Sequence, residues 1–118
     1  MRYLCIVYHD EKELASQPQS EIDRRIAESL AVDEELKRSG NSIACDALQP
    51  VATATTVRMR NGKLSVTDGP FAETKEQLGG FYLVEATDLN DAIQVAARIP
   101  GARIGSIEVR PTLTIPAM

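Results

Sequence analysis

Residues 2–8 carry apolar side chains at nearly every position, so a strand here is largely apolar on both faces. The alternating sets are Leu4, Ile6 and Tyr8 on one face, and Tyr3, Cys5 and Val7 on the other. Residues 80–86 repeat this pattern. A strand that is apolar on both faces is covered on both sides, so these segments predict strands that are shielded from water on both faces.

Two stretches have the three-to-four-residue periodicity of amphipathic helices. The first covers residues 21–38, with Ser20 as its expected N-cap. The second covers residues 88–99 and begins after a cap at Thr87 or Asp88. The chain therefore has two predicted helices, each with an apolar stripe to bury against the sheet.

The remaining β-patterned segments complete the plan; they are residues 42–48, 55–60, 63–67 and 105–110. Asn61-Gly62 accepts the positive φ angles of a type I′ turn, which predicts a hairpin. The order strand, helix, strand, hairpin, strand, helix, strand is that of a ferredoxin-like βαββαβ α+β fold with an inserted hairpin. We expect one domain over residues 1–118.

Two helices can cover only one face of this sheet. The opposite face would expose several large apolar side chains, each contributing ~1.5–3 kcal/mol when buried. A second copy of the chain is the economical cover, so we expect a homodimer in which two sheets pack face to face.

Composition narrows the function classes. The net charge of −4 gives no basic field for nucleic acid, and no apolar run is long enough to span a membrane. No small-residue cleavage site follows the first apolar run, so we expect no signal peptide and a cytoplasmic protein in which Cys5 and Cys45 are reduced. The sequence has no Cys/His cluster with zinc spacing and no phosphate-cradling loop, and we expect neither a metal nor a cofactor.

The first predicted helix contains an unusual polar pair. Its apolar arc consists of Ile22, Ile26, Leu30, Val32 and Leu36. Ser29 and Asp33 fall in the middle of this arc, one turn apart. An aspartate in a core-facing stripe is costly unless it is paired or hydrated. Either the helix sits over a sheet edge or Asp33 bonds to nearby backbone, or the two residues form the wall of a polar pocket.

His9 is the single histidine, at the end of the first strand and before Asp10. Sites often lie where strands end next to a helix, and an imidazole there can act as a general acid or base near neutral pH. The alternative is an ordinary surface histidine.

Residues 68–80 form a distinctive loop. Asp68-Gly69-Pro70 is a tight-turn sequence, and Phe71 is expected to anchor the loop to the core. Thr74 and Lys75 would then face a cleft. The alternative is a purely structural connection into the next strand.

Residues 68–76 read Asp-Gly-Pro-Phe-Ala-Glu-Thr-Lys-Glu, the motif for which the DGPFAETKE proteins are named. The similarity extends to residues 48–50, 52–58, 77–82, 96–100 and 108–111. The chain thus resembles the DGPF family of the YCII-related superfamily over nearly its whole length. This resemblance implies a ferredoxin-like fold that dimerises as an α/β barrel.

The resemblance implies less about activity. Most such proteins are bacterial and of unknown role, and some occur beside or fused to sigma factors. A few YCII-related proteins resemble lyases that eliminate chloride from an aromatic ring, using a helix His and an Asp as an acid/base dyad. Here the helix position that commonly carries His is Ser29, and either Asp10 or Asp46 would be the acid. His9 would have to supply an imidazole from the opposite wall.

Three hypotheses follow. The preferred one is a module that binds a small molecule between the first helix and the sheet. The second is a lyase or isomerase in which His9 acts with Asp10 or Asp33. The third is a regulatory partner, for example of a sigma factor. The expected ligand-contacting residues are Ser29, Asp46, Asp68, Phe71 and Lys75.

Overall fold

The computed structural model describes residues 1–115 and contains a four-stranded antiparallel sheet in the order β2-β5-β1-β6. Its strands are β1 (Arg2–His9), β2 (Ser42–Ala47), β5 (Gln77–Glu85) and β6 (Ser106–Pro111). The chain is therefore a mixed α+β protein, as the sequence predicts, and the strand order is consistent with the ferredoxin-like plan.

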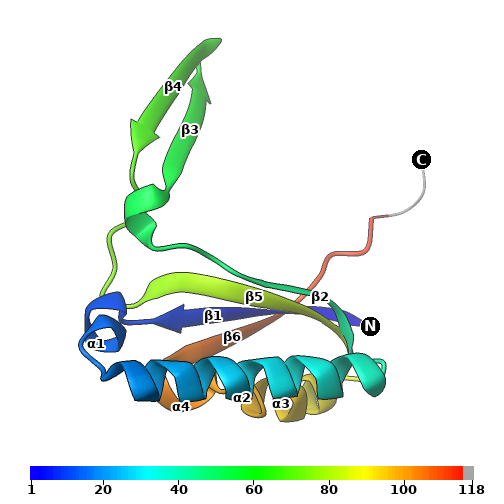
Figure 1. Ribbon diagram of the computed structural model, residues 1–118. Helices are drawn as coiled ribbons and strands as arrows, with labels where there is room; N and C mark the ends of the chain where they lie inside the picture. The colour runs from blue at the N-terminus through cyan, green and yellow to red at the C-terminus, as the bar shows by residue number, and fades with distance from the viewer. Residues whose placement is uncertain (116–118) are drawn as a thin grey trace.

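Helices lie on one side of this sheet (Figure 1). They are α2 (Gln19–Arg38), α3 (Leu89–Ala97) and α4 (Gly101–Ile104). The short α1 (Glu11–Ala15) lies beside the end of β1, and the 3-10 turn η1 (Val51–Thr53) lies on the other side of the sheet. The two long helices are those predicted, whereas α1 and α4 were not expected. Their four or five residues are too short to show an amphipathic period.

The caps correct one prediction and confirm another. Helix α2 begins at Gln19 after Pro18, which supplies no side-chain hydrogen bond, so Ser20 is not the N-cap. Proline fixes φ in a range suited to a helix start, which explains why the helix begins earlier than expected. Asp88 caps α3 as predicted, because its carboxylate accepts from the Asp91 amide at 2.8 Å.

The core lies between the sheet and the helices. Its fully buried side chains are Cys5, Val84, Leu36 and Ala92, with Tyr3, Val95, Ala96 and Ile99 around them. Tyr3, Cys5 and Val7 therefore point to the helices, and the alternate set on β1 points to the opposite face. On that face Leu4 pairs with Leu83 and Ile6 with Phe81 in adjacent strands. None of these four side chains is fully buried.

A separate hairpin projects from the body on the side away from the helices (Figure 1). It consists of β3 (Thr55–Arg60) and β4 (Lys63–Asp68), joined by Asn61 and Gly62. The φ angles of these two residues are 51° and 73°, which confirms the predicted turn with two positive φ values. The hairpin forms its own two-stranded sheet.

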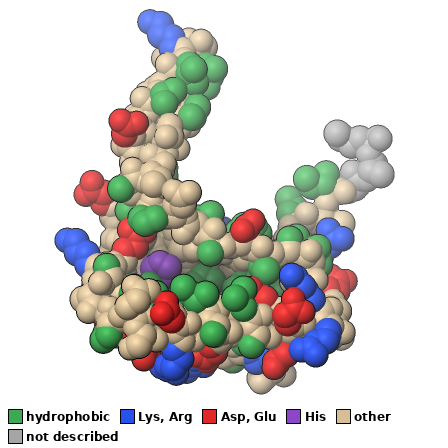
Figure 2. All heavy atoms as spheres, in the orientation of Figure 1, with side chains coloured by type: hydrophobic (Ala, Val, Ile, Leu, Met, Phe, Trp, Pro, Cys, Tyr) green, Lys and Arg blue, Asp and Glu red, His purple; other side chains and the backbone are tan. Residues whose placement is uncertain are grey.

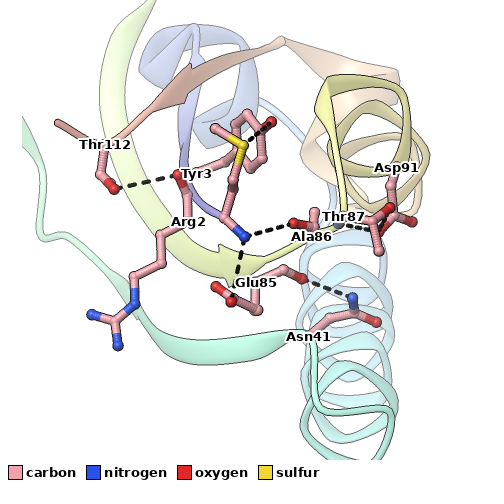
Figure 3. A network of polar contacts seen from close by, with 9 residues as sticks. Arg2, Tyr3, Asn41, Glu85, Ala86, Thr87, Asp91 and Thr112 are labelled. Carbon is pink, nitrogen blue, oxygen red and sulfur yellow. Dashed lines mark hydrogen bonds and ion pairs between the residues drawn. The ribbon is translucent and has the colours of Figure 1, made fainter. Parts of the chain in front are cut away.

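The amino terminus is tied to the corner between β5 and α3 (Figure 3). The Met1 ammonium donates to the Ala86 carbonyl at 3.0 Å, and Asn41 donates to the Glu85 carbonyl at 3.0 Å. These contacts hold the start of β1 and the end of β2's neighbour β5 together, while the pairing of β1 with β5 and β6 places it inside the sheet.

None of the helices within residues 1–115 combines the length and apolar character needed to cross a bilayer.

Candidate functional site

A cavity of about 500 Å³ lies between α2, α4 and the helix-facing side of the sheet. This volume falls in the range of about 300–1,000 Å³ typical of small-molecule sites. Figure 2 shows the hollow above α2, with the single histidine in purple at one end and hydrophobic side chains along its rim. Most of the wall surface is apolar, although charged residues from α2, α4 and the sheet also line it.

Ser29 and Asp33 of α2 both line this cavity and are half-buried. The Oδ1 atom of Asp33 is buried and has no hydrogen-bond partner among the described residues. A buried acceptor without a partner lowers the stability of the folded protein by about 1–3 kcal/mol, and by more when the group is charged. Such atoms are therefore rare in folded proteins. The polar pair therefore lies in the wall of the cavity, with one carboxylate oxygen of Asp33 buried there.

The same helix explains why two predicted core residues are exposed. Ile26 and Leu30 belong to the expected apolar arc, yet their side chains are 54% and 61% exposed. Both line the cavity, so the arc does not rest on the sheet at this point. Further along α2 the helix meets the sheet, where Leu36 is fully buried.

Two sheet residues, Tyr82 of β5 and Cys45 of β2, lie near Asp33 of α2 and also line the cavity. Burial raises the pKa of the Tyr82 hydroxyl above its ordinary value of 10.0. Asp33 raises it further, first by accepting a hydrogen bond from the neutral hydroxyl and then through its negative charge, which opposes ionisation. Burial likewise raises the pKa of Cys45, with Asp33 as the next contributor. Both groups therefore stay neutral at physiological pH and can offer hydrogen bonds but no charge.

Sequence reasoning missed Tyr82. It pairs with Cys5 on one side and Cys45 on the other, so it stands in a row of helix-facing residues. The period-two pattern from buried Val84 could have placed Tyr82 on this face. Its proximity to Asp33 depends on how α2 crosses the sheet, which the pattern does not specify.

His9 occupies the opposite end of the cavity, at the end of β1. The β1–β5 register shifts between Val7 and Tyr8, where a bulge occurs. The imidazole lies directly against Gly79, where a Cβ would be only 2.1 Å from the ring Cε1. Glycine at this position thus leaves the space that the ring occupies.

Arginines at the cavity are already paired with carboxylates of the chain. Arg103 of α4 forms an ion pair with Glu28 of α2, which joins the two helices across the cavity. Arg24 and Arg25 both pair with Glu21, Arg25 at 3.8 Å. Each of these three arginines is therefore already in an ion pair. Among the described residues, no arginine that lines the cavity lacks a carboxylate partner.

Of the predicted site residues, His9, Ser29 and Asp33 line the cavity. Asp46 also borders it from β2, but it is paired with Phe81, which places it on the other face of the sheet. Asp10 does not line the cavity. Its carboxylate caps α1, accepting from the Lys12 amide at 3.0 Å, and it lines a separate, smaller hollow of about 180 Å³.

Asp68, Phe71 and Lys75 lie outside both hollows, in or after the projecting hairpin. The expectation that Phe71 anchors the loop to the core is wrong, because its side chain is 80% exposed. The loop leaves a hairpin that stands away from the core, and the ring instead packs under the Arg58 guanidinium at 5.7 Å.

The end of this loop is held by a glutamine. The Gln77 side chain donates to the Thr74 carbonyl at 2.7 Å and accepts from the Glu11 amide at 2.9 Å. These bonds tie the loop to α1 and fit the alternative interpretation of the segment as a structural connection into β5.

Comparison with known proteins places this α+β chain in a family. The family model of the YCII-related domain matches residues 1–115, and the chain belongs to the YCII-related family. It is also similar to an uncharacterised protein of Rhizobium meliloti (strain 1021), with 37% identity over 113 residues, covering 94% of this chain and 91% of the relative. The predicted relationship to YCII-related proteins is thereby confirmed.

Proposed function

We propose that this protein binds a small molecule in the cavity beneath α2. The observation that carries the proposal is the buried, unpartnered Oδ1 of Asp33 at a cavity of about 500 Å³. A ligand that donates a hydrogen bond to this oxygen would supply the partner that the buried acceptor needs. None of the described residues forms a hydrogen bond with that oxygen.

The walls indicate the chemistry of the ligand. Ile26, Leu30 and Ile99 supply apolar surface, so the body of the ligand is apolar. The buried Oδ1 of Asp33 can accept a hydrogen bond from an N–H or O–H group of the ligand. The arginines that line the cavity already form ion pairs with glutamates of the chain. A neutral or cationic compound with an apolar body and one donor group therefore fits better than an anion.

We also propose that the binding form is a homodimer built as an α/β barrel. Leu4, Ile6, Phe81 and Leu83 lie on the sheet face that no helix covers. Two such faces packed about 10 Å apart would bury these side chains and leave the cavity on the outer, helix-covered side of each sheet. The cavity and the dimer contact thus use opposite faces of the same strands.

A thermal-shift screen with small amines and alcohols on aromatic or aliphatic bodies tests the binding proposal. Wild-type protein should show a higher melting temperature with at least one compound. Asp33→Asn should weaken that binding by ~10-fold or more, because a hydrogen bond to a charged group contributes about 1.5–3 kcal/mol.

Glu34→Gln is the matched control, since Glu34 is the next residue on the same helix, is exposed and does not line the cavity. It should bind like wild type. Equal affinity in Asp33→Asn, or no stabilising compound at all, would contradict the proposal.

A second candidate function is an isomerase that moves a proton between two atoms of the ligand through the His9 imidazole. The supporting observation is that His9 lines the same cavity as Asp33, from a different structural element. A His9→Gln variant that binds the compound but no longer catalyses exchange of its protons with solvent deuterium would favour this alternative. Absence of exchange in the wild-type protein leaves binding as the function.

A further inference from the structure

The projecting hairpin has one apolar and one polar face. Cross-strand neighbours on the apolar face are Val57 with Val66 and Met59 with Leu64. These four side chains are between 59% and 64% exposed. The neighbouring pairs, which point to the other face, are Thr56 with Thr67, Arg58 with Ser65 and Arg60 with Lys63.

This amphipathic pattern is typical of a sheet that packs on one side. A hairpin of two strands is marginally stable by itself in water, and here its apolar face meets no other part of the described chain closely enough to be buried. Four large apolar side chains on a thin arm also form the kind of exposed patch that marks an interaction surface.

The arm and the uncovered sheet face form the two sides of a corner. The hairpin rises from the side of the sheet opposite the helices (Figure 1). Hydrophobic side chains gather on the part of the arm that overlooks the sheet (Figure 2). A body seated on the open sheet face would therefore meet the apolar face of the arm at the same time.

Overall dimensions agree with a chain shaped to hold a partner. The radius of gyration is 16.3 Å, compared with about 13.5 Å for a compact domain of this length. The accessible surface is 8397 Å², compared with about 6,300 Å² for a compact monomer of this mass. The excess of about 2,000 Å² per chain is of the size that subunits of obligate homodimers bury, about 2,000–5,000 Å² for both together.

We propose that the β3–β4 hairpin is an arm that docks its Val57, Met59, Leu64 and Val66 face onto the second copy of the chain. This inference rests on the dimer proposed above and adds a second contact to it. Strands of six residues extend for about 20 Å, whereas packed sheets lie about 10 Å apart. The arm is thus long enough to pass the partner's sheet and reach its helix layer.

The opposite face of the arm stays in solvent in this arrangement. It carries Arg58, Arg60 and Lys63, whose charges would be costly to bury without partners. The sequence therefore distinguishes the two faces at alternate positions, with an apolar residue wherever the second copy is met and a polar one wherever water is met.

The test is the dimer dissociation constant, measured by analytical ultracentrifugation. Met59→Lys with Leu64→Glu makes the apolar face polar while placing opposite charges across the two strands, which favours the hairpin itself. We expect dimerisation to weaken by roughly 100-fold or more, because two large side chains lose their burial.

The matched control exchanges two cross-strand residues on the polar face, Arg60→Lys with Lys63→Arg, which leaves composition, net charge and the contact between Arg58 and Phe71 unchanged. It should dimerise like wild type. A second variant removes the arm by joining Thr55 to Asp68 through Asn-Gly, which retains the hydrogen bond between Gly69 and Ala54 at the base of the hairpin. It should weaken dimerisation at least as much.

The outcomes separate this inference from the pocket. An unchanged dissociation constant in both arm variants overturns the role of the arm and leaves a dimer formed by the sheet face alone. A wild-type chain that stays monomeric at 100-fold the concentration of the assay overturns both the arm and the dimer. The rise in melting temperature caused by the compound tests the cavity separately from the dimer. This rise should persist in Met59→Lys/Leu64→Glu and should be reduced in Asp33→Asn.

Discussion

Gly79→Ala should displace the histidine from the cavity wall. A methyl group at Gly79 would lie 2.1 Å from Cε1, 2.6 Å from Nε2 and 2.7 Å from Nδ1 of His9. Non-bonded carbon atoms normally lie about 3.5–4.0 Å apart, so the ring has to move by more than 1 Å or the strands must separate. Overpacking of this kind typically lowers the free energy of unfolding by about 1–3 kcal/mol.

A double-mutant cycle shows whether this clash is the cause. Removal of the ring in His9→Ala makes room for the methyl group, so His9→Ala/Gly79→Ala should be within about 0.5 kcal/mol of His9→Ala alone. Gly105→Ala is the contrasting case, since a Cβ there would lie 2.0 Å from the backbone oxygen of Tyr8. Loss of the His9 ring should not rescue that variant.

Urea denaturation measures the free energies, and the imidazole resonances report on the ring directly because the chain has one histidine. In Gly79→Ala these resonances should shift. Unaltered stability and resonances in Gly79→Ala, or simple additivity in the double variant, would refute the assigned contact between His9 and Gly79.

Three further predictions concern caps and titration. Asp88→Ala should lower the free energy of unfolding by about 1 kcal/mol through loss of the α3 cap, whereas Asn90→Ala, at an exposed position, should change it little; equal effects would contradict the cap. Burial raises the pKa of the Cys5 thiol from 9.0 to about 11. The buried neutral thiol therefore contributes fully to the free energy of unfolding below pH 9, and this contribution is lost as the pH rises to 11, because the thiol of the unfolded chain ionises first. Denaturation at a series of pH values should show a loss of about 2–3 kcal/mol in the wild-type protein and none in Cys5→Ala. The same pH dependence of the free energy of unfolding in both proteins would contradict this prediction. In ultraviolet titration, Asp33→Asn should lower the raised pKa of Tyr82, identified by its loss in Tyr82→Phe, and no change would contradict their proximity.

Much of the fold could be predicted because local signals and burial agree. The double-faced apolar pattern of residues 2–8 identified a strand, and β1 spans Arg2–His9. Asn61-Gly62 identified the hairpin, since its conformation is set by those two residues. In contrast, α1 and α4 depend on their surroundings: the five residues of α1 are capped by Asp10, a signal too common in loops to identify a helix.

The candidate site could be predicted only in part. Helical periodicity alone showed that Ser29 and Asp33 share a face, and both line the cavity. The approach of Tyr82 to Asp33 and of His9 to Gly79 depends on strand register, including a bulge that no residue pattern announces. Phe71 misled because an aromatic residue in a loop usually indicates burial, yet this loop follows a hairpin that leaves the body.

The most direct test of the cavity beneath α2 is a crystal structure of the protein with the compound that raises its melting temperature most. The account predicts electron density for that compound among Ser29, Asp33 and Tyr82, with its donor within hydrogen-bond distance of Asp33 Oδ1. A compound bound elsewhere, or a cavity closed by packed side chains with Asp33 turned to bulk solvent, would contradict it.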